Sequence, residues 1–163
     1  MKFPARNALT LIALLCFAAL AIALVSQYAF DLQPCAWCVL QRLIYLAIGL
    51  LCLLALAAGG VARTLAAAAS ALLAAGGIAS AWYQYTVAAN LFSCEQTFAD
   101  RFMNGLGLDA AVPWLFGIYA TCMDAAVKVL GLEYALWSLL LFAALFLLAL
   151  AALFRRRSRR SPY

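Results

Sequence analysis

The sequence predicts an all-α membrane protein, a four-helix transmembrane bundle with both termini in the cytoplasm and two loops on the opposite side. Composition, four long apolar runs and a separation of charge lead to this fold class. Of the 163 residues, 69% are hydrophobic and 10% are charged, whereas soluble domains are roughly half apolar and a quarter charged. An apolar run of about 18 residues crosses a hydrocarbon core of ~30 Å. We therefore expect a single integral membrane domain over residues 1–163.

The first predicted span covers residues 8–25. The alternative for this run is a cleaved signal peptide, with Lys2 and Arg6 as its basic start and residues 21–23 (Ala-Ile-Ala) as a weak cleavage site. The run is longer than a usual signal core, and four helices bury more surface than three. A span is therefore the preferred interpretation.

Three further spans follow along the chain. The second covers about residues 39–58 and carries Gln41 and Arg42 near its start. The third covers 65–82, and the fourth covers 134–154. The third is rich in alanine and contains small residues that let helix backbones approach closely in lipid. These residues are Gly76, Gly77 and Ser80.

Charged residues orient the predicted bundle, because Lys and Arg are retained on the cytoplasmic side. One side has eight basic residues and no acid: Lys2, Arg6, Arg63, Arg155, Arg156, Arg157, Arg159 and Arg160. The other side has all six acids, Asp31, Glu95, Asp100, Asp109, Asp124 and Glu133, with Arg101 and Lys128. We expect outer loops at about 26–34 and 83–133 and a basic cytoplasmic tail at 155–163.

The net charge of +5 does not indicate nucleic-acid binding. Basic residues directly after a spanning helix anchor its topology and can meet anionic lipid headgroups. The lipid bilayer is therefore the partner that this charge predicts.

Four of the six cysteines lie at the outer boundary or outside it, namely Cys35, Cys38, Cys94 and Cys122. In an oxidising compartment four such thiols predict two disulfides, although spacing alone allows three pairings. Proximity suggests Cys35 with Cys38, which leaves Cys94 with Cys122. A zinc or iron–sulfur site is disfavoured because there is no second CxxC pair, so no metal is expected.

The other two cysteines, Cys16 and Cys52, fall in the middle of predicted spans. Cys52 lies 14 residues beyond Cys38, which places it about 21 Å deeper along a helix, too far for a disulfide. We expect both to be buried thiols without a redox role.

The stretch from Pro34 to Arg42 has the pattern of a redox site at a helix start. Proline suits the first turn of a helix, where the positive end of the helix dipole favours a thiolate. Arg42 lies four residues after Cys38 and hence on the same face, which Tyr45 and Gly49 continue. A guanidinium there can stabilise a thiolate or bind a carbonyl oxygen of a lipid-soluble ligand, while snorkelling to the headgroups is the alternative.

Histidine is absent from the chain. The commonest haem and copper ligand is therefore missing, and a b-type haem carrier is not expected. A quinone dissolved in the bilayer is the natural acceptor for two electrons at the membrane edge.

These motifs resemble the disulfide bond formation protein B (DsbB) family, the inner-membrane thiol:quinone oxidoreductases of Gram-negative bacteria. The resemblance covers nearly the whole chain: "CAWCVLQR" opens the second span, "SCEQTFADRF" and "AVPWLFGIYATC" bound the long loop, and "LGLEYALWSLL" enters the last span. It implies a bacterial inner-membrane location with the active cysteines on the periplasmic side.

The resemblance also implies a role for each cysteine. Reduced DsbA, or a DsbA-like periplasmic thiol oxidase, would attack Cys94 and free Cys122, which would pass to Cys35 and leave Cys38 as a thiolate beside the quinone. Electrons would leave through Cys38 into ubiquinone or menaquinone, with Arg42 holding the quinone or the thiolate. Some family members carry a loop histidine proposed to assist at the quinone, and this chain has none.

Two other functions fit part of this pattern. A vitamin K epoxide reductase-like protein also pairs a membrane CxxC with loop cysteines, but normally places the active pair late in its bundle. A non-enzymatic bundle stapled by two disulfides is the third possibility. Within the outer loop, the apolar stretch Val112–Tyr119 is expected either to rest on the membrane surface or to pack on the outer end of the bundle.

Overall fold

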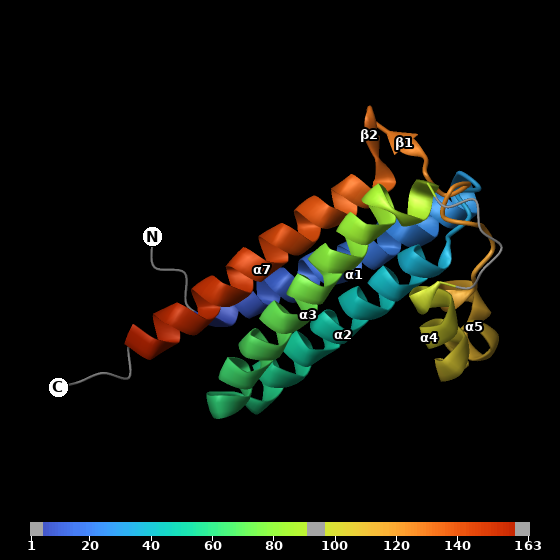
Figure 1. Cartoon of the computed structure of the whole chain (residues 1–163). Coiled ribbons are helices and arrows are strands. Elements are labelled where there is room, and N and C mark those ends of the chain that lie inside the picture. The colour runs from blue at the N-terminus through green and yellow to red at the C-terminus, as the bar shows by residue number, and fades with distance from the viewer. Residues whose placement is uncertain (1–4, 91–96, 159–163) are drawn as a thin grey trace.

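A computed structural model of the chain describes residues 5–90 and 97–158 (Figure 1). Four long helices dominate it: α1 (Ala5–Ala29), α2 (Ala36–Ala58), α3 (Gly60–Thr86) and α7 (Tyr134–Ser158). Each is long and apolar enough to cross a membrane. The predicted all-α class with a four-helix bundle is therefore confirmed, and each helix contains its predicted apolar run and extends beyond it at one or both ends.

The four helices pack as a ring in which α1 contacts α2 and α7, and α3 contacts α2 and α7. Figure 1 shows them side by side along the length of the bundle, with the start of α1 and the end of α7 at one end. At that end α2 turns directly into α3 through Gly59 and Gly60, whose φ angles are +70° and +45°. Glycine adopts this left-handed region without a Cβ penalty, which allows so short a connection.

The contact between α3 and α7 is the most extensive in the bundle. It includes Gly77, where an added Cβ would lie 2.4 Å from the ring of Phe142. The neighbouring Gly76 faces open space. Of the two glycines that the sequence singled out for close packing, only Gly77 has that role.

The opposite end of the bundle carries the short elements (Figure 1). They are η1 (Ala88–Asn90), α4 (Phe98–Leu106), α5 (Leu108–Ala111), α6 (Pro113–Phe116), β1 (Lys128–Val129) and β2 (Leu132–Glu133). The two strands pair antiparallel through a tight turn at Leu130 and Gly131, both with positive φ, as two-residue hairpins require. The sequence predicted only a loop here.

The stretch Val112–Tyr119 packs on the outer end of the bundle over part of its length. It contains α6, where Leu115 and Phe116 are buried and α6 contacts α2. Trp114 is 57% exposed, and its carbonyl accepts a hydrogen bond from the Tyr28 hydroxyl at 2.9 Å. This segment therefore joins the outer loop to α2 and to the end of α1.

Candidate functional site: a sulfur cluster at the mouth of an apolar cleft

Cys35 and Cys38 lie where α2 begins. Cys35 is the N-cap residue with extended backbone angles, and its carbonyl accepts the first helical hydrogen bond from Val39 at 3.0 Å. The helix therefore starts at Ala36, so Cys38 lies in its first turn, whereas Pro34 and Cys35 precede it and do not lie in the first turn as the sequence predicted. The Cys35 and Cys38 Sγ atoms are 3.3 Å apart.

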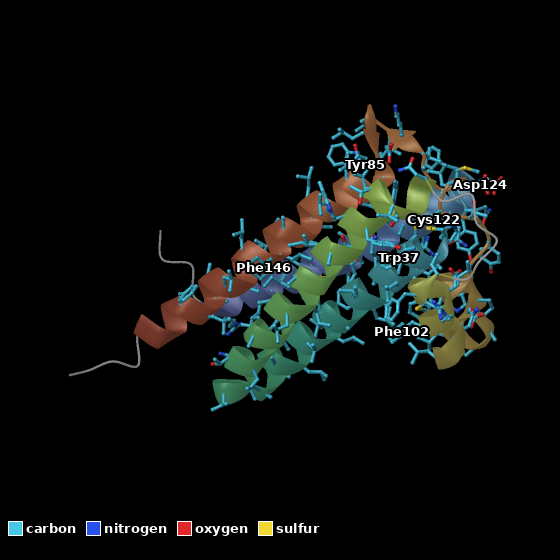
Figure 2. The ribbon with its side chains drawn as sticks, viewed as in Figure 1. Trp37, Tyr85, Phe102, Cys122, Asp124 and Phe146 are labelled. Atoms are coloured by element: carbon cyan, nitrogen blue, oxygen red, sulfur yellow. The ribbon has the colours of Figure 1, made fainter. Side chains whose placement is uncertain are left out.

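The second outer loop brings Cys122 to this pair, although it lies 87 positions further along the chain. Its Sγ is 2.8 Å from the Sγ of Cys35. Two backbone N–H groups, those of Tyr119 and Ala120, donate to the Pro34 carbonyl at 3.0 and 3.3 Å and fix the loop across the start of α2. Figure 2 shows Cys122 at the same end of the bundle as Trp37, one of the two residues between the cysteines of the CxxC motif.

The contact with Cys122 and burial both raise the pKa of the Cys35 thiol. Cys35 is 1% exposed, and its hydrogen bond with the Cys122 sulfur is the main cause that raises its pKa to about 12, with burial as a further cause. Cys35 is therefore a neutral thiol at neutral pH when it is reduced.

The remaining predicted cysteine, Cys94, lies outside the described residues. The predicted pairing of Cys94 with Cys122 therefore stays a prediction. Cys35 contacts both Cys38 and Cys122, so the geometry is compatible with a disulfide that moves between these two partners.

Two buried glutamines complete the cluster, and sequence reasoning missed their role. Gln84 of α3 donates through Nε2 to Cys38 Sγ at 3.1 Å, and Gln41 of α2 donates to Gln84 Oε1 at 2.7 Å. A signal for Gln84 existed: it lies four residues after Ser80 and seven after Gly77, on the small-residue face that packs inward.

Arg42 is buried beside the cluster, with 5% of its surface exposed. Its guanidinium donates to Gln27 Oε1 at 2.7 Å, to the Leu115 carbonyl at 3.1 Å and to the Ala23 carbonyl at 3.2 Å. A guanidinium has five N–H donors, so two are left without a partner among the described residues. The group thus joins α1, α2 and α6 while keeping donors for a ligand.

A cleft of about 950 Å³ opens next to these residues. It is lined by residues of α1, α2 and α7, by Gln84 of α3, and by the outer loops and the hairpin; most of the lining surface is apolar. Cys38 and Arg42 line it together with Tyr45, whose hydroxyl lies 2.9 Å from Ser138 Oγ. The cluster therefore has one side in an apolar cleft and the other side under the outer loop.

Cys16 and Cys52 are placed apart from this cluster. Both are fully buried within the bundle, and Cys52 Sγ lies 3.5 Å from Ser70 Oγ. Neither lines the cleft.

Four apolar helices with three clustered sulfurs beside an apolar cleft define a class: a multi-pass membrane protein equipped for thiol–disulfide exchange. Comparison with known proteins agrees with this class. The family described as "Disulfide bond formation protein DsbB" matches residues 5–152.

Individual relatives match over nearly their full length. Disulfide bond formation protein B of Cupriavidus metallidurans is 35% identical over 157 residues, covering 96% of this chain and 97% of that protein. The protein of the same name from Ralstonia nicotianae is 33% identical over 160 residues, covering 98% and 100%. That of Stutzerimonas stutzeri is 33% identical, covering 96% and 99%.

The chain belongs to the DsbB family of disulfide bond formation proteins. It is accordingly a thiol:quinone oxidoreductase of the membrane, and its function is to reoxidise DsbA and so sustain disulfide formation in the periplasm. This confirms the family predicted from the motifs rather than the vitamin K epoxide reductase-like alternative.

Proposed function

We propose that electrons pass through this chain from a DsbA-like periplasmic thiol oxidase to ubiquinone or menaquinone, by way of Cys94, Cys122, Cys35 and Cys38. The observation that carries this route is the position of Cys35. Its sulfur lies 2.8 Å from Cys122 and 3.3 Å from Cys38, so a disulfide at Cys35 can change partner with little movement.

The route begins with Cys94 paired to Cys122 and Cys35 paired to Cys38. A thiolate of the reduced partner attacks Cys94, so a mixed disulfide forms and Cys122 leaves as a thiolate. The partner's second thiol then attacks the mixed disulfide, which releases the oxidised partner and leaves Cys94 as a thiol.

The Cys122 thiolate next attacks Cys35, so the Cys35–Cys122 bond forms and Cys38 is released as a thiolate. Attack of Cys94 on Cys122 breaks the Cys35–Cys122 bond, restores the Cys94–Cys122 disulfide and frees Cys35. Cys35 and Cys38 then hold the two electrons and two protons that the partner delivered. Loss of these to the acceptor restores the Cys35–Cys38 disulfide.

The cleft suits a quinone as that acceptor. Most of its lining surface is apolar, and its polar groups include Cys38, Arg42 and Tyr45 together with Gln84 and two aspartates, Asp31 and Asp124; an apolar pocket with a few polar groups is the usual make-up of a site for an apolar ligand. Arg42 would hold a ring oxygen through its unused N–H donors, and Cys38 would lie against the ring. A quinone bound there supplies an acceptor for two electrons.

We further propose that the cluster faces the periplasm and that both termini are cytoplasmic. The support is the charge distribution, because Arg6 of α1, Arg63 of α3 and the arginines at 155–157 of α7 belong to the helix ends remote from Cys35. A periplasmic cluster is the arrangement that a soluble periplasmic donor requires.

The test is quinone reduction by the purified protein with reduced DsbA as electron donor. We expect Cys38→Ala to abolish the reaction, whereas Cys16→Ala and Cys52→Ala retain it, because those two thiols lie outside the cleft. Loss of activity in a well-folded Cys16→Ala or Cys52→Ala variant would contradict the assignment, as would full activity of Cys38→Ala.

A further inference from the structure

We propose that Gln84 is a catalytic residue that hydrogen bonds to the Cys38 thiolate, and that this bond decides which sulfur leaves when the Cys35–Cys38 disulfide opens. The inference rests on the relay proposed above and assigns a step in it to a side chain outside the CxxC motif.

The amide of Gln84 discriminates between the two sulfurs. Its Nε2 lies 3.1 Å from Cys38 Sγ and 3.8 Å from Cys35 Sγ. Gln84 is 4% exposed, so water does not readily replace this donor. A hydrogen bond to an ionised acceptor is roughly twice as strong as one between neutral groups. The contact therefore gains strength at the moment when Cys38 becomes a thiolate.

Gln41 fixes the direction in which the Gln84 amide points. Its Nε2 donates to Gln84 Oε1 at 2.7 Å, and both side chains are buried. A primary amide has its acceptor oxygen and donor nitrogen on opposite sides. With the oxygen engaged by Gln41 of α2, the nitrogen faces the sulfurs. Gln41 is thus a positioning residue for Gln84.

The opening step is a thiol–disulfide exchange without net oxidation. The electron pair of the Cys122 thiolate forms the new bond to Cys35, the Cys35–Cys38 bond breaks, and its electron pair stays on Cys38. Exchange is faster when the leaving thiolate is better stabilised. Gln84 stabilises Cys38 in this way, and Cys38 is also the sulfur that lines the cleft. The released thiolate is therefore produced where the acceptor binds.

The experiment measures an equilibrium between two disulfide isomers in the full-length chain carrying Cys94→Ser, purified without quinone. One isomer has Cys35 bonded to Cys38 and a free Cys122; the other has Cys35 bonded to Cys122 and a free Cys38. Samples held between about pH 6 and 9 are quenched with acid, alkylated and mapped by peptide mass spectrometry. The measured quantity is the ratio of the second isomer to the first.

Gln84→Met keeps a side chain of similar length and removes the donor. We expect it to lower this ratio by about tenfold at a given pH, the loss of one hydrogen bond to a charged group. Gln41→Met leaves the donor in place but frees its orientation, so a smaller decrease is expected. The matched control is Ser80→Ala on the same helix. Among the described residues Ser80 donates only to the Gly77 carbonyl, at 2.9 Å within α3, so the isomer ratio of this variant should equal that of the parent.

An unchanged ratio in folded Gln84→Met, as judged by its thermal unfolding, would overturn the inference. Should Gln84→Met fail to fold, an unchanged ratio in Gln41→Met would overturn it instead. Failure of the proposed relay has a different signature: the parent chain would then hold no Cys35–Cys122 bond at any pH. A normal ratio in Gln84→Met with lost quinone reduction would also refute the inference, because Gln84 would then serve the acceptor and not the sulfur.

Discussion

At the scale of single residues, Arg42 is the buried cation of the site, and its hydrogen bonds go to one amide and two backbone carbonyls. Neutral partners leave the positive charge available to an electronegative ligand or a thiolate in the cleft. Placing a cation within the membrane costs free energy, so such a residue is a candidate for a functional role.

Replacement of Arg42 by alanine is expected to weaken quinone use. Loss of one charge-assisted hydrogen bond, about 1.5–3 kcal/mol, should raise the apparent KM for quinone by roughly tenfold or more. Steady-state quinone reduction measures this. Arg63→Ala is the matched control, since it removes the same charge at the opposite end of the bundle, where Arg63 donates to the Leu56 carbonyl. An unchanged KM for Arg42→Ala would show that the guanidinium has only a structural role.

Cys35 gives a second prediction at this scale, from the pH dependence of its reactivity. A pKa of about 12 in the folded, reduced protein means that the thiolate fraction at pH 8 is about one in ten thousand. Alkylation of Cys35 should therefore be very slow at pH 8 and accelerate as the pH rises towards 12. Because the contact with Cys122 is the largest cause, Cys122→Ala should make Cys35 react faster at pH 8. Equal rates in both proteins would disprove this account.

At the scale of elements, the packing of α3 on α7 holds Gln84 and the wall of the cleft in place. The rings of Tyr45 and Phe142 are stacked with their centroids 4.2 Å apart, which links α2 to the contact between α3 and α7. Phe142 reaches Tyr45 because Gly77 leaves room for its ring. The absence of a side chain at Gly77 of α3 therefore helps to position Tyr45, which lines the cleft.

Two glycine substitutions test this packing. Gly77→Ala should destabilise the bundle by about 1–3 kcal/mol, because its Cβ would overlap the Phe142 ring. Gly76→Ala should be neutral or stabilising by up to about 1 kcal/mol, because the added methyl group meets open space and alanine favours the helix. Thermal unfolding in detergent compares the two. Similar melting temperatures for both variants would contradict the proposed packing.

The short helix α4 shows which outer elements local sequence could have revealed. Thr97 and Asp100 form a reciprocal capping box at its start, and Gly107 ends it in the left-handed conformation, both recognisable signals. By contrast, the tilted ring contacts of Trp37 with Tyr83 and with Phe98, which join α2, α3 and α4, have no such local pattern.

At the scale of the whole molecule, the cysteine cluster lies at one end of the bundle, whereas Arg6, Arg63 and the arginines at 155–157 belong to the helix ends at the other. Positive residues are retained in the cytoplasm during insertion. This separation predicts that the cysteine cluster is on the side of the soluble donor, whereas the arginines at the other end of the bundle contact the cytoplasmic lipid surface.

Labelling of spheroplasts with a membrane-impermeant maleimide tests that orientation. After mild reduction, Cys122 should be labelled, and a tail cysteine introduced by Ser161→Cys should be labelled only once the membrane is permeabilised. Peptide mass spectrometry identifies the site. The reverse pattern would place the cluster in the cytoplasm and exclude a periplasmic donor.

The sequence by itself determined the membrane class, the four apolar helices and the helix start at the CxxC motif, since hydropathy and helix initiation depend on residues close together in the chain. It also predicted Cys35, Cys38, Cys94, Cys122 and Arg42 as site residues, and the structure brings these together except for Cys94, which lies outside the described residues. Residue type and spacing were sufficient for these predictions because cysteine pairs and intramembrane arginines are uncommon without a use.

Only the tertiary structure decided which groups meet. The contact of Cys122 with Cys35, that of Arg42 with Leu115, and that of Gln84 with Cys38 span 87, 73 and 46 positions. They depend on the path of the outer loop and on the rotation of α3 against α2. Helix rotation in lipid follows from side-chain packing rather than from hydropathy, because every face of such a helix is apolar.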